Sequence, residues 1–170
     1  MHNTADTPNP IPSRARFAFR RPAAAGKPDR VRVLIVDDHA LFAEVLEVTL
    51  QANPRIEVTG CAGDGLEAIE SARALRPDVV LMDLEMPVMN GIDATGRIRS
   101  ELPDSQVVVV TASSDPESER RARSAGATGY LRKGCSAAEL LAAIFEAVTP
   151  RAPDRARTVP DLARVQPCAA

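Results

Sequence analysis

The feature that most constrains the fold is a strict alternation, repeated five times, of a short apolar run and a longer amphipathic segment. Short apolar runs rich in β-branched residues are typical of buried strands. The intervening segments carry apolar residues at helical spacing, as at Leu41, Val45 and Val48. Five strands that are each followed by a helix require parallel pairing with helices on both faces. The sequence therefore predicts a doubly wound α/β domain.

Local signals place the elements along the chain. Ser136 with Glu139 forms a capping box, and Asp64 with Glu67 resembles an acidic version of it. Pro116 fits the first turn of a further helix. We expect strands over residues 31–36, 56–61, 79–82, 107–110 and 128–131, and helices over 41–50, 64–76, 92–98, 116–125 and 136–148.

The two ends of the chain differ from this body in composition. Residues 1–30 and 150–170 mix Pro, Ala and Arg without periodicity, and we expect both to be flexible arms around a single domain over 31–149. The arms carry net charges of +4 and +2, whereas the body carries −8. An acidic body is a poor match to a nucleic-acid-binding surface.

Cysteine usage and hydropathy indicate the compartment. The three cysteines, Cys61, Cys135 and Cys168, are widely spaced and form no CxxC motif, which argues against a disulfide framework or a zinc site. No apolar stretch approaches the length of a membrane span, and prolines interrupt any signal-peptide pattern near the N-terminus. We expect a cytoplasmic protein with no membrane association.

Polar residues gather at the predicted carboxyl ends of the strands. Asp37 and Asp38 follow the first strand, Asp83 the third, Thr111 the fourth and Lys133 the fifth. Sites in parallel sheets form at this edge. Three carboxylates crowded together repel one another unless a hard cation is present, and Mg²⁺ prefers a few carboxylates with several waters. The sequence predicts a magnesium site here.

The same residues predict phosphoryl chemistry. A metal ion, the Lys133 ammonium and the Thr111 hydroxyl together surround a dianionic phosphoryl group with positive charge and donors. An ionised carboxylate such as Asp83 can act as the nucleophile without a general base and form an acyl phosphate. His39 could serve as a metal ligand or a phosphocarrier, but it has no second histidine nearby, and we interpret it as a partly exposed residue at a helix start.

Four strings resemble those of bacterial response-regulator receiver domains: VLIVDDHALF, VVLMDLEMPVMNGIDA, VVVVTA and GATGYLRK. They occur in the order and spacing of that family, and the resemblance covers residues 31–149 nearly end to end. The resemblance implies a flavodoxin-like fold with strand order 2-1-3-4-5, for which a relative of this family is a standard example. The Asp-Asp-His start is similar to the branch that is usually joined to a helix-turn-helix domain.

The resemblance also implies roles for individual residues. Asp83 corresponds to the phosphoacceptor, and Asp37 and Asp38 to metal ligands. The backbone carbonyl of Glu85 corresponds to a further ligand. Thr111 and Lys133 would bind phosphoryl oxygens. Tyr130 occupies the position of the family's aromatic switch residue, whose side-chain rotamer changes together with that of Thr111 on phosphorylation.

The implied partners are a histidine kinase or a histidine phosphotransfer protein. The output would be a protein contact, such as homodimerisation or docking on another regulator, and the protein would be a signalling switch that is not an enzyme beyond its own phosphorylation and dephosphorylation. One departure from the family is Gly134, where a cis-linked proline is common. Another is that residues 150–170 are too few for a helix-turn-helix domain.

Three alternatives stay open. The chain could be a transcriptional regulator without its DNA-binding part, or a receiver used for docking without phosphorylation. A haloacid-dehalogenase-like phosphatase also uses a nucleophilic Asp with Mg²⁺, but that family has a second Asp two residues later, where this chain has Glu85.

Overall fold

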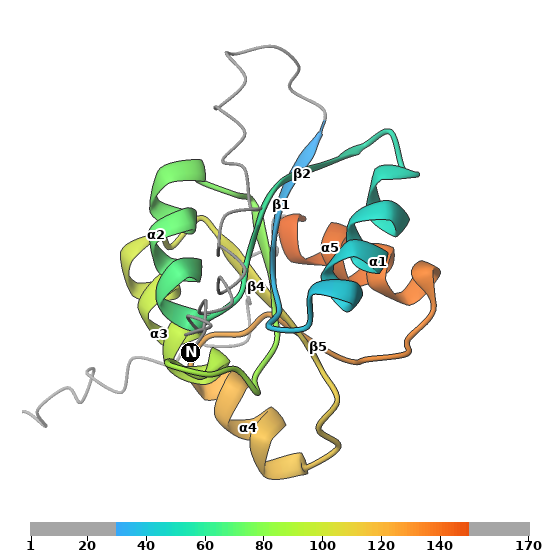
Figure 1. Cartoon of the computed structure of the whole chain (residues 1–170). Coiled ribbons are helices and arrows are strands. Elements are labelled where there is room, and N and C mark those ends of the chain that lie inside the picture. Colours follow the sequence, from blue (N-terminus) through green and yellow to red (C-terminus); the bar gives the residue numbers. More distant parts are fainter. Residues whose placement is uncertain (1–29, 150–170) are drawn as a thin grey trace, which may run out of the picture.

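A computed structural model describes residues 30–149, which form a five-stranded parallel sheet in the order β2-β1-β3-β4-β5 (Figure 1). This order and the strict strand–helix alternation confirm the predicted flavodoxin-like α/β fold. The elements are β1 (Val31–Val36), α1 (Ala40–Gln51), β2 (Ile56–Ala62), α2 (Gly65–Leu75), β3 (Val79–Met82), α3 (Gly91–Glu101), β4 (Gln106–Thr111), α4 (Pro116–Ser124), β5 (Gly129–Arg132) and α5 (Ala137–Val148).

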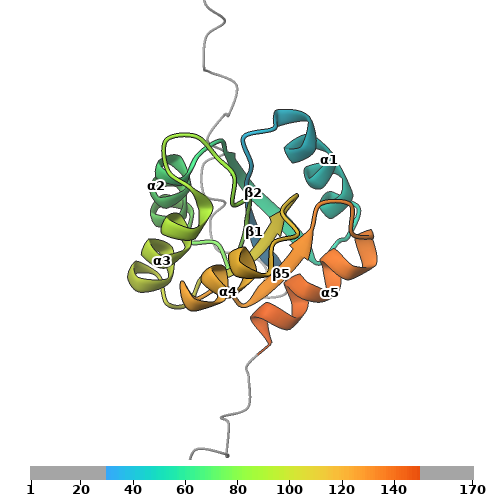
Figure 2. The ribbon, with the colours of Figure 1, turned by 90° about the horizontal axis from the view of Figure 1, so that it is seen from below.

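The helices cover both faces of the sheet. Figure 2 shows α1 and α5 on one side and α2, α3 and α4 on the other. Side chains along β1 alternate between these layers, because successive residues of a strand point to opposite faces. Leu34 and Val36 belong to the core beneath α2 and α3, whereas Val33 and Ile35 belong to the core beneath α1 and α5. Each of these four side chains is at most 1% exposed, so β1, which lies inside the sheet between β2 and β3, is apolar on both faces.

Four of the five helices begin with a side-chain cap, supplied by Asp64, Asn90, Asp115 and Ser136. The predicted capping box of Ser136 is present. The predicted acidic version, formed by Asp64 and Glu67, is not a strict capping box, because the Glu67 side chain accepts from the backbone N–H of Gly63 instead of that of Asp64. The remaining helix, α1, begins at His39 without a side-chain cap.

The packing of α1 differs from the pattern that predicted the helix. The helix itself is confirmed, but Leu41, Val45 and Val48 are 79%, 61% and 71% exposed. The residues that pack on the sheet are Ala43, Leu46 and Leu50. This helix is apolar on two faces, so helical spacing alone does not identify the buried one.

The predicted arms, residues 1–30 and 150–170, lie outside the described residues apart from Arg30. Within the described part, no helix has the length and apolar character needed to cross a membrane.

Candidate functional site

Three acidic residues lie together at the carboxyl ends of two neighbouring strands. Asp37 and Asp38 follow β1, and Asp83 follows β3 directly beside it. The backbone N–H of Asp83 donates to the carbonyl of Val36, which fixes the two strand ends relative to each other. The side chains of Asp37 and Asp83 are only 2% and 3% exposed, whereas that of Asp38 is 28% exposed. Two of the three carboxylates are therefore largely removed from water.

Lys133 lies between the two buried carboxylates. Its Nζ is 2.7 Å from Oδ2 of Asp37 and 2.6 Å from Oδ2 of Asp83. Burial alone would lower the pKa of Lys133, but the hydrogen bonds to Asp37 and Asp83 and their negative charge outweigh it, so the pKa is raised. The ammonium is held as a fixed positive charge, and it also lies 4.7 Å from the centre of the Phe42 ring.

The backbone after β3 positions the Asp83 carboxylate. Its Oδ1 accepts from the backbone N–H of Leu84 at 2.7 Å and, more distantly, from that of Glu85 at 3.4 Å. The N–H of Gly91 in turn donates to the carbonyl of Leu84. One Asp83 oxygen thus faces the loop and the other faces Lys133.

The remaining predicted residues lie on the neighbouring strands. Thr111 ends β4 and is buried, and its carbonyl accepts from the backbone N–H of Lys133 at 2.8 Å. Tyr130 on β5 is half-buried, and its hydroxyl lies 3.5 Å from the carbonyl of Ser113. Burial, followed by the negative charge of nearby acids, raises the pKa of Tyr130.

For His39 the sequence favoured an exposed residue at a helix start over a metal ligand, and it did not predict the contacts of the ring. The residue is exposed at the start of α1, as expected, but its Nδ1 lies 2.7 Å from Oδ1 of Asp38 and 3.5 Å from Oδ1 of Asp37. A histidine directly after two acids at a strand end was the only available signal.

The three carboxylates fit a hard divalent cation, and the His39 imidazole lies beside them. Four residues can each supply one ligand atom such that these atoms all lie within 4.8 Å of one another: Asp37, Asp38, His39 and Asp83. Three carboxylates against one ammonium leave a net charge of −2 when His39 is neutral, which a divalent ion would balance. The arrangement can hold such an ion beside a carboxylate nucleophile and a fixed ammonium.

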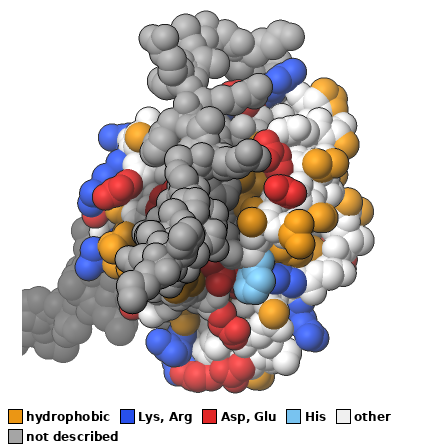
Figure 3. Space-filling model, in the orientation of Figure 1, with side chains coloured by type: hydrophobic (Ala, Val, Ile, Leu, Met, Phe, Trp, Pro, Cys, Tyr) orange, Lys and Arg blue, Asp and Glu red, His pale blue; other side chains and the backbone are white. Residues whose placement is uncertain are grey.

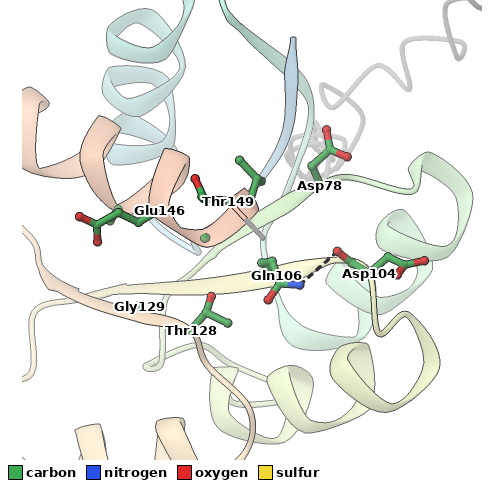
Figure 4. Close-up of a pocket in the computed structure, with 10 residues that line it drawn as sticks. Asp78, Asp104, Gln106, Thr128, Gly129, Glu146 and Thr149 are labelled. Carbon is green, nitrogen blue, oxygen red and sulfur yellow. Dashed lines mark hydrogen bonds between the residues drawn. The ribbon is translucent and has the colours of Figure 1, made fainter. Parts of the chain in front are cut away.

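A pocket of about 500 Å³ lies at the other edge of the sheet (Figure 4). It is lined by Gln106 and Gly129 at the amino ends of β4 and β5, and by Glu146 and Thr149 near the end of α5. None of the predicted site residues lines it.

Comparisons with known proteins agree with this geometry. The sequence model of the response regulator receiver domain matches residues 33–145. The transcriptional regulatory protein LiaR of Bacillus subtilis is 45% identical over 114 residues, which cover 67% of this chain and 54% of LiaR. The response regulator GacA of Pseudomonas viridiflava is 41% identical over 114 residues, or 67% of this chain and 53% of GacA. The chain spans about half the length of these curated relatives.

Solved structures give the same result. The signal receiver domain of the response regulator NarL from Mycobacterium tuberculosis superposes with a TM-score of 0.69 at 35% identity, covering 73% of this chain and all of that domain. The response regulator domain of CheB from Thermotoga maritima superposes with a TM-score of 0.65 at 36% identity, covering 70% and 96% of the two chains.

Proposed function

The chain belongs to the response regulator receiver domain family, and on this basis we propose that Asp83 accepts a phosphoryl group from a histidine kinase or a histidine phosphotransfer protein. The observation that carries the proposal is the pair formed by Lys133 with the buried Asp83 carboxylate, at 2.6 Å. The ammonium of Lys133 lies directly beside this carboxylate, and an ionised carboxylate needs no base to act as a nucleophile.

The transfer involves one bond formed and one broken. An oxygen of Asp83 attacks the phosphorus of a phosphohistidine, and the P–N bond breaks with its electron pair staying on the imidazole nitrogen. The product is an acyl phosphate on Asp83. Lys133 then donates to a phosphoryl oxygen, and the Thr111 hydroxyl is the second donor that we assign to this group.

We propose Mg²⁺ as the cofactor, held by the carboxylates of Asp37, Asp38 and Asp83 and by the backbone carbonyl of Glu85. When bound, the ion neutralises charge on the phosphoryl oxygens. The close grouping of the carboxylates supports this assignment.

Output follows from a rearrangement near β4 and β5. We assign the switch to Thr111 and Tyr130, because a new contact of the Thr111 hydroxyl alters the loop after β4, where the carbonyl of Ser113 lies near the tyrosine hydroxyl. The result would be a protein contact, such as homodimerisation on phosphorylation. The chain would act as a signalling switch, with chemistry limited to its own phosphorylation and dephosphorylation.

The donor protein needs a surface beside the site. Helix α1 offers an exposed apolar face close to the site, formed by Leu41, Val45 and Val48. The first of these residues lies three positions after Asp38. Figure 3 shows hydrophobic side chains gathered on the side of the molecule where α1 lies. A small apolar face suits a transient partner. A cytoplasmic location fits the free thiols of Cys61 and Cys135.

A second candidate function is supported by the relatives. LiaR is named a transcriptional regulatory protein, and the matched region covers about half of it. Under this alternative the same phosphorylation would regulate a DNA-binding part that is not within the described residues.

Acetyl phosphate and Mg²⁺ provide the test, read by intact-protein mass spectrometry. We expect one added phosphoryl group in the wild type, and none in Asp83→Asn or in the presence of a chelator. If a reference receiver is modified under the same conditions while this chain is not, the proposal fails and docking without phosphorylation becomes the better account.

A further inference from the structure

The start of α1 is unusual among the described helices. The other four begin at Asp, Asn or Ser residues whose side chains cap the first turn. At the corresponding position of α1, His39 makes no cap hydrogen bond. An uncapped start costs a helix about 1 kcal/mol, so this position does not favour the stability of α1.

The His39 side chain faces the acidic residues instead. Its Nδ1 lies 2.7 Å from Asp38 and 3.5 Å from Asp37. In an octahedral ion with bonds of about 2.1 Å, adjacent ligand atoms are about 3.0 Å apart. The two observed separations lie on either side of that value. In the structure Nδ1 makes an ion-pair contact with Asp38 and a longer approach to Asp37, and the same separations would let this nitrogen share one ion with both carboxylates.

We infer that His39 is a nitrogen ligand of this metal site, which therefore binds a borderline transition ion such as Ni²⁺ more tightly than carboxylates alone would. This inference rests on the metal site of the proposed function and goes beyond it. Imidazole is a preferred ligand of Ni²⁺ and Zn²⁺, whereas Mg²⁺ strongly prefers oxygen. His39 consequently changes which ion the site selects without being needed for Mg²⁺.

The surroundings of His39 permit this role. Its side chain is 69% exposed, so the ring can adjust and the position tolerates substitution. The only other imidazole of the chain is His2, outside the described residues. A His2→Gln background therefore leaves one imidazole to assign.

The test uses Mn²⁺ as the probe in that background, with His39→Gln as the matched variant and circular dichroism to verify folding. Pulsed electron paramagnetic resonance detects ¹⁴N coupled to bound Mn²⁺. The electron paramagnetic resonance signal of free Mn²⁺ then reports how much Mn²⁺ is displaced from the protein by added Ni²⁺ or Mg²⁺. We expect ¹⁴N coupling that disappears in His39→Gln. We also expect that variant to need at least ~10-fold more Ni²⁺ for displacement, while the Mg²⁺ requirement changes by less than about twofold.

Two results would overturn the inference. If Mn²⁺ binds without ¹⁴N coupling, and Ni²⁺ displaces it equally from both proteins, then His39 is not a ligand, although the acidic site stands. If Asp83→Asn leaves Mn²⁺ binding unchanged and Mg²⁺ does not compete, the divalent site of the proposed function fails together with the inference.

Discussion

Gly91 at the start of α3 packs against the backbone of Asp83 so closely that a Cβ at position 91 would overlap the Asp83 carbonyl oxygen. The same glycine donates its N–H to Leu84. The loop that carries Asp83, the proposed phosphoacceptor, therefore closes on a residue without a side chain, which links the stability of α3 to the geometry of the site.

Gly91→Ala tests this close approach. Overpacking against rigid backbone should destabilise the protein by about 1–3 kcal/mol and slow phosphorylation by acetyl phosphate, because Asp83 is displaced. The matched control is Gly96→Ala in the same helix, where an added Cβ meets no atom within 4 Å. In this control the free energy of unfolding should rise by about 0.5–1 kcal/mol, because alanine favours a helix more than glycine does. Urea unfolding followed by far-ultraviolet circular dichroism measures both, and equal effects would contradict the account.

Lys133→Met tests the ammonium between the acids. Removing one partner of a buried ion pair leaves uncompensated charge on Asp37 and Asp83, at a cost of about 3 kcal/mol. Mg²⁺ should restore part of this loss, since a bound cation replaces the missing charge. We therefore expect a larger Mg²⁺-dependent increase in melting temperature for the variant than for the wild type. The exposed neighbour Arg132 provides the control: Arg132→Met should stay within about 0.5 kcal/mol of the wild type.

Cys61 gives a prediction on pH. Burial, and then the charges of Glu47 and Glu67, raise the pKa of its thiol to about 11. The thiolate is the reactive form, so alkylation of native Cys61 by iodoacetamide should be slow at pH 8 and rise steeply towards pH 11. A thiol whose pKa is raised by folding favours the folded state below its unfolded pKa, and this contribution is lost as the pH rises through about 11. Peptide mapping by mass spectrometry follows the reaction, and rapid labelling of the folded protein at pH 8 would contradict a raised pKa of this half-buried thiol.

Tyr130 offers a direct optical signal. It is the only tyrosine, and the chain has no tryptophan, so intrinsic fluorescence reports this residue. Mg²⁺ with beryllofluoride, which mimics a phosphoryl group, should change the emission of the wild type. The change should be absent in Asp83→Asn and reduced in Thr111→Ala. An unaltered signal under conditions where beryllofluoride binds would remove Tyr130 from the switch.

The sequence predicted the strands almost to the residue, most clearly β1, β3 and β4, which contain apolar runs that end at polar residues, whereas β2 and β5 include polar residues. It also placed Asp37, Asp83, Thr111 and Lys133 at one edge, since the rule for parallel sheets depends only on strand order. It could not identify which face of α1 packs on the sheet. Leu41 and Leu46 are equally apolar, and only the position of the sheet makes one exposed and the other buried.

Side-chain contacts inside the site were also beyond the sequence. Helix-start preferences gave no reason to connect His39 with Asp38, and the 2.7 Å approach depends on how the chain turns after β1. Similarly, Gly134 has a φ of 97°, a conformation that proline cannot adopt. No peptide bond among the described residues is cis, so the bond that precedes Gly134 is trans.

Locating the phosphoryl group tests the central claim most directly. After reaction with acetyl phosphate and Mg²⁺, borohydride reduces an aspartyl phosphate to homoserine, which peptide sequencing by mass spectrometry can assign to one position. The account predicts homoserine at position 83 and nowhere else, dependent on Mg²⁺. Homoserine at Asp37 or Asp38, or a phosphoryl group that resists borohydride, would contradict it.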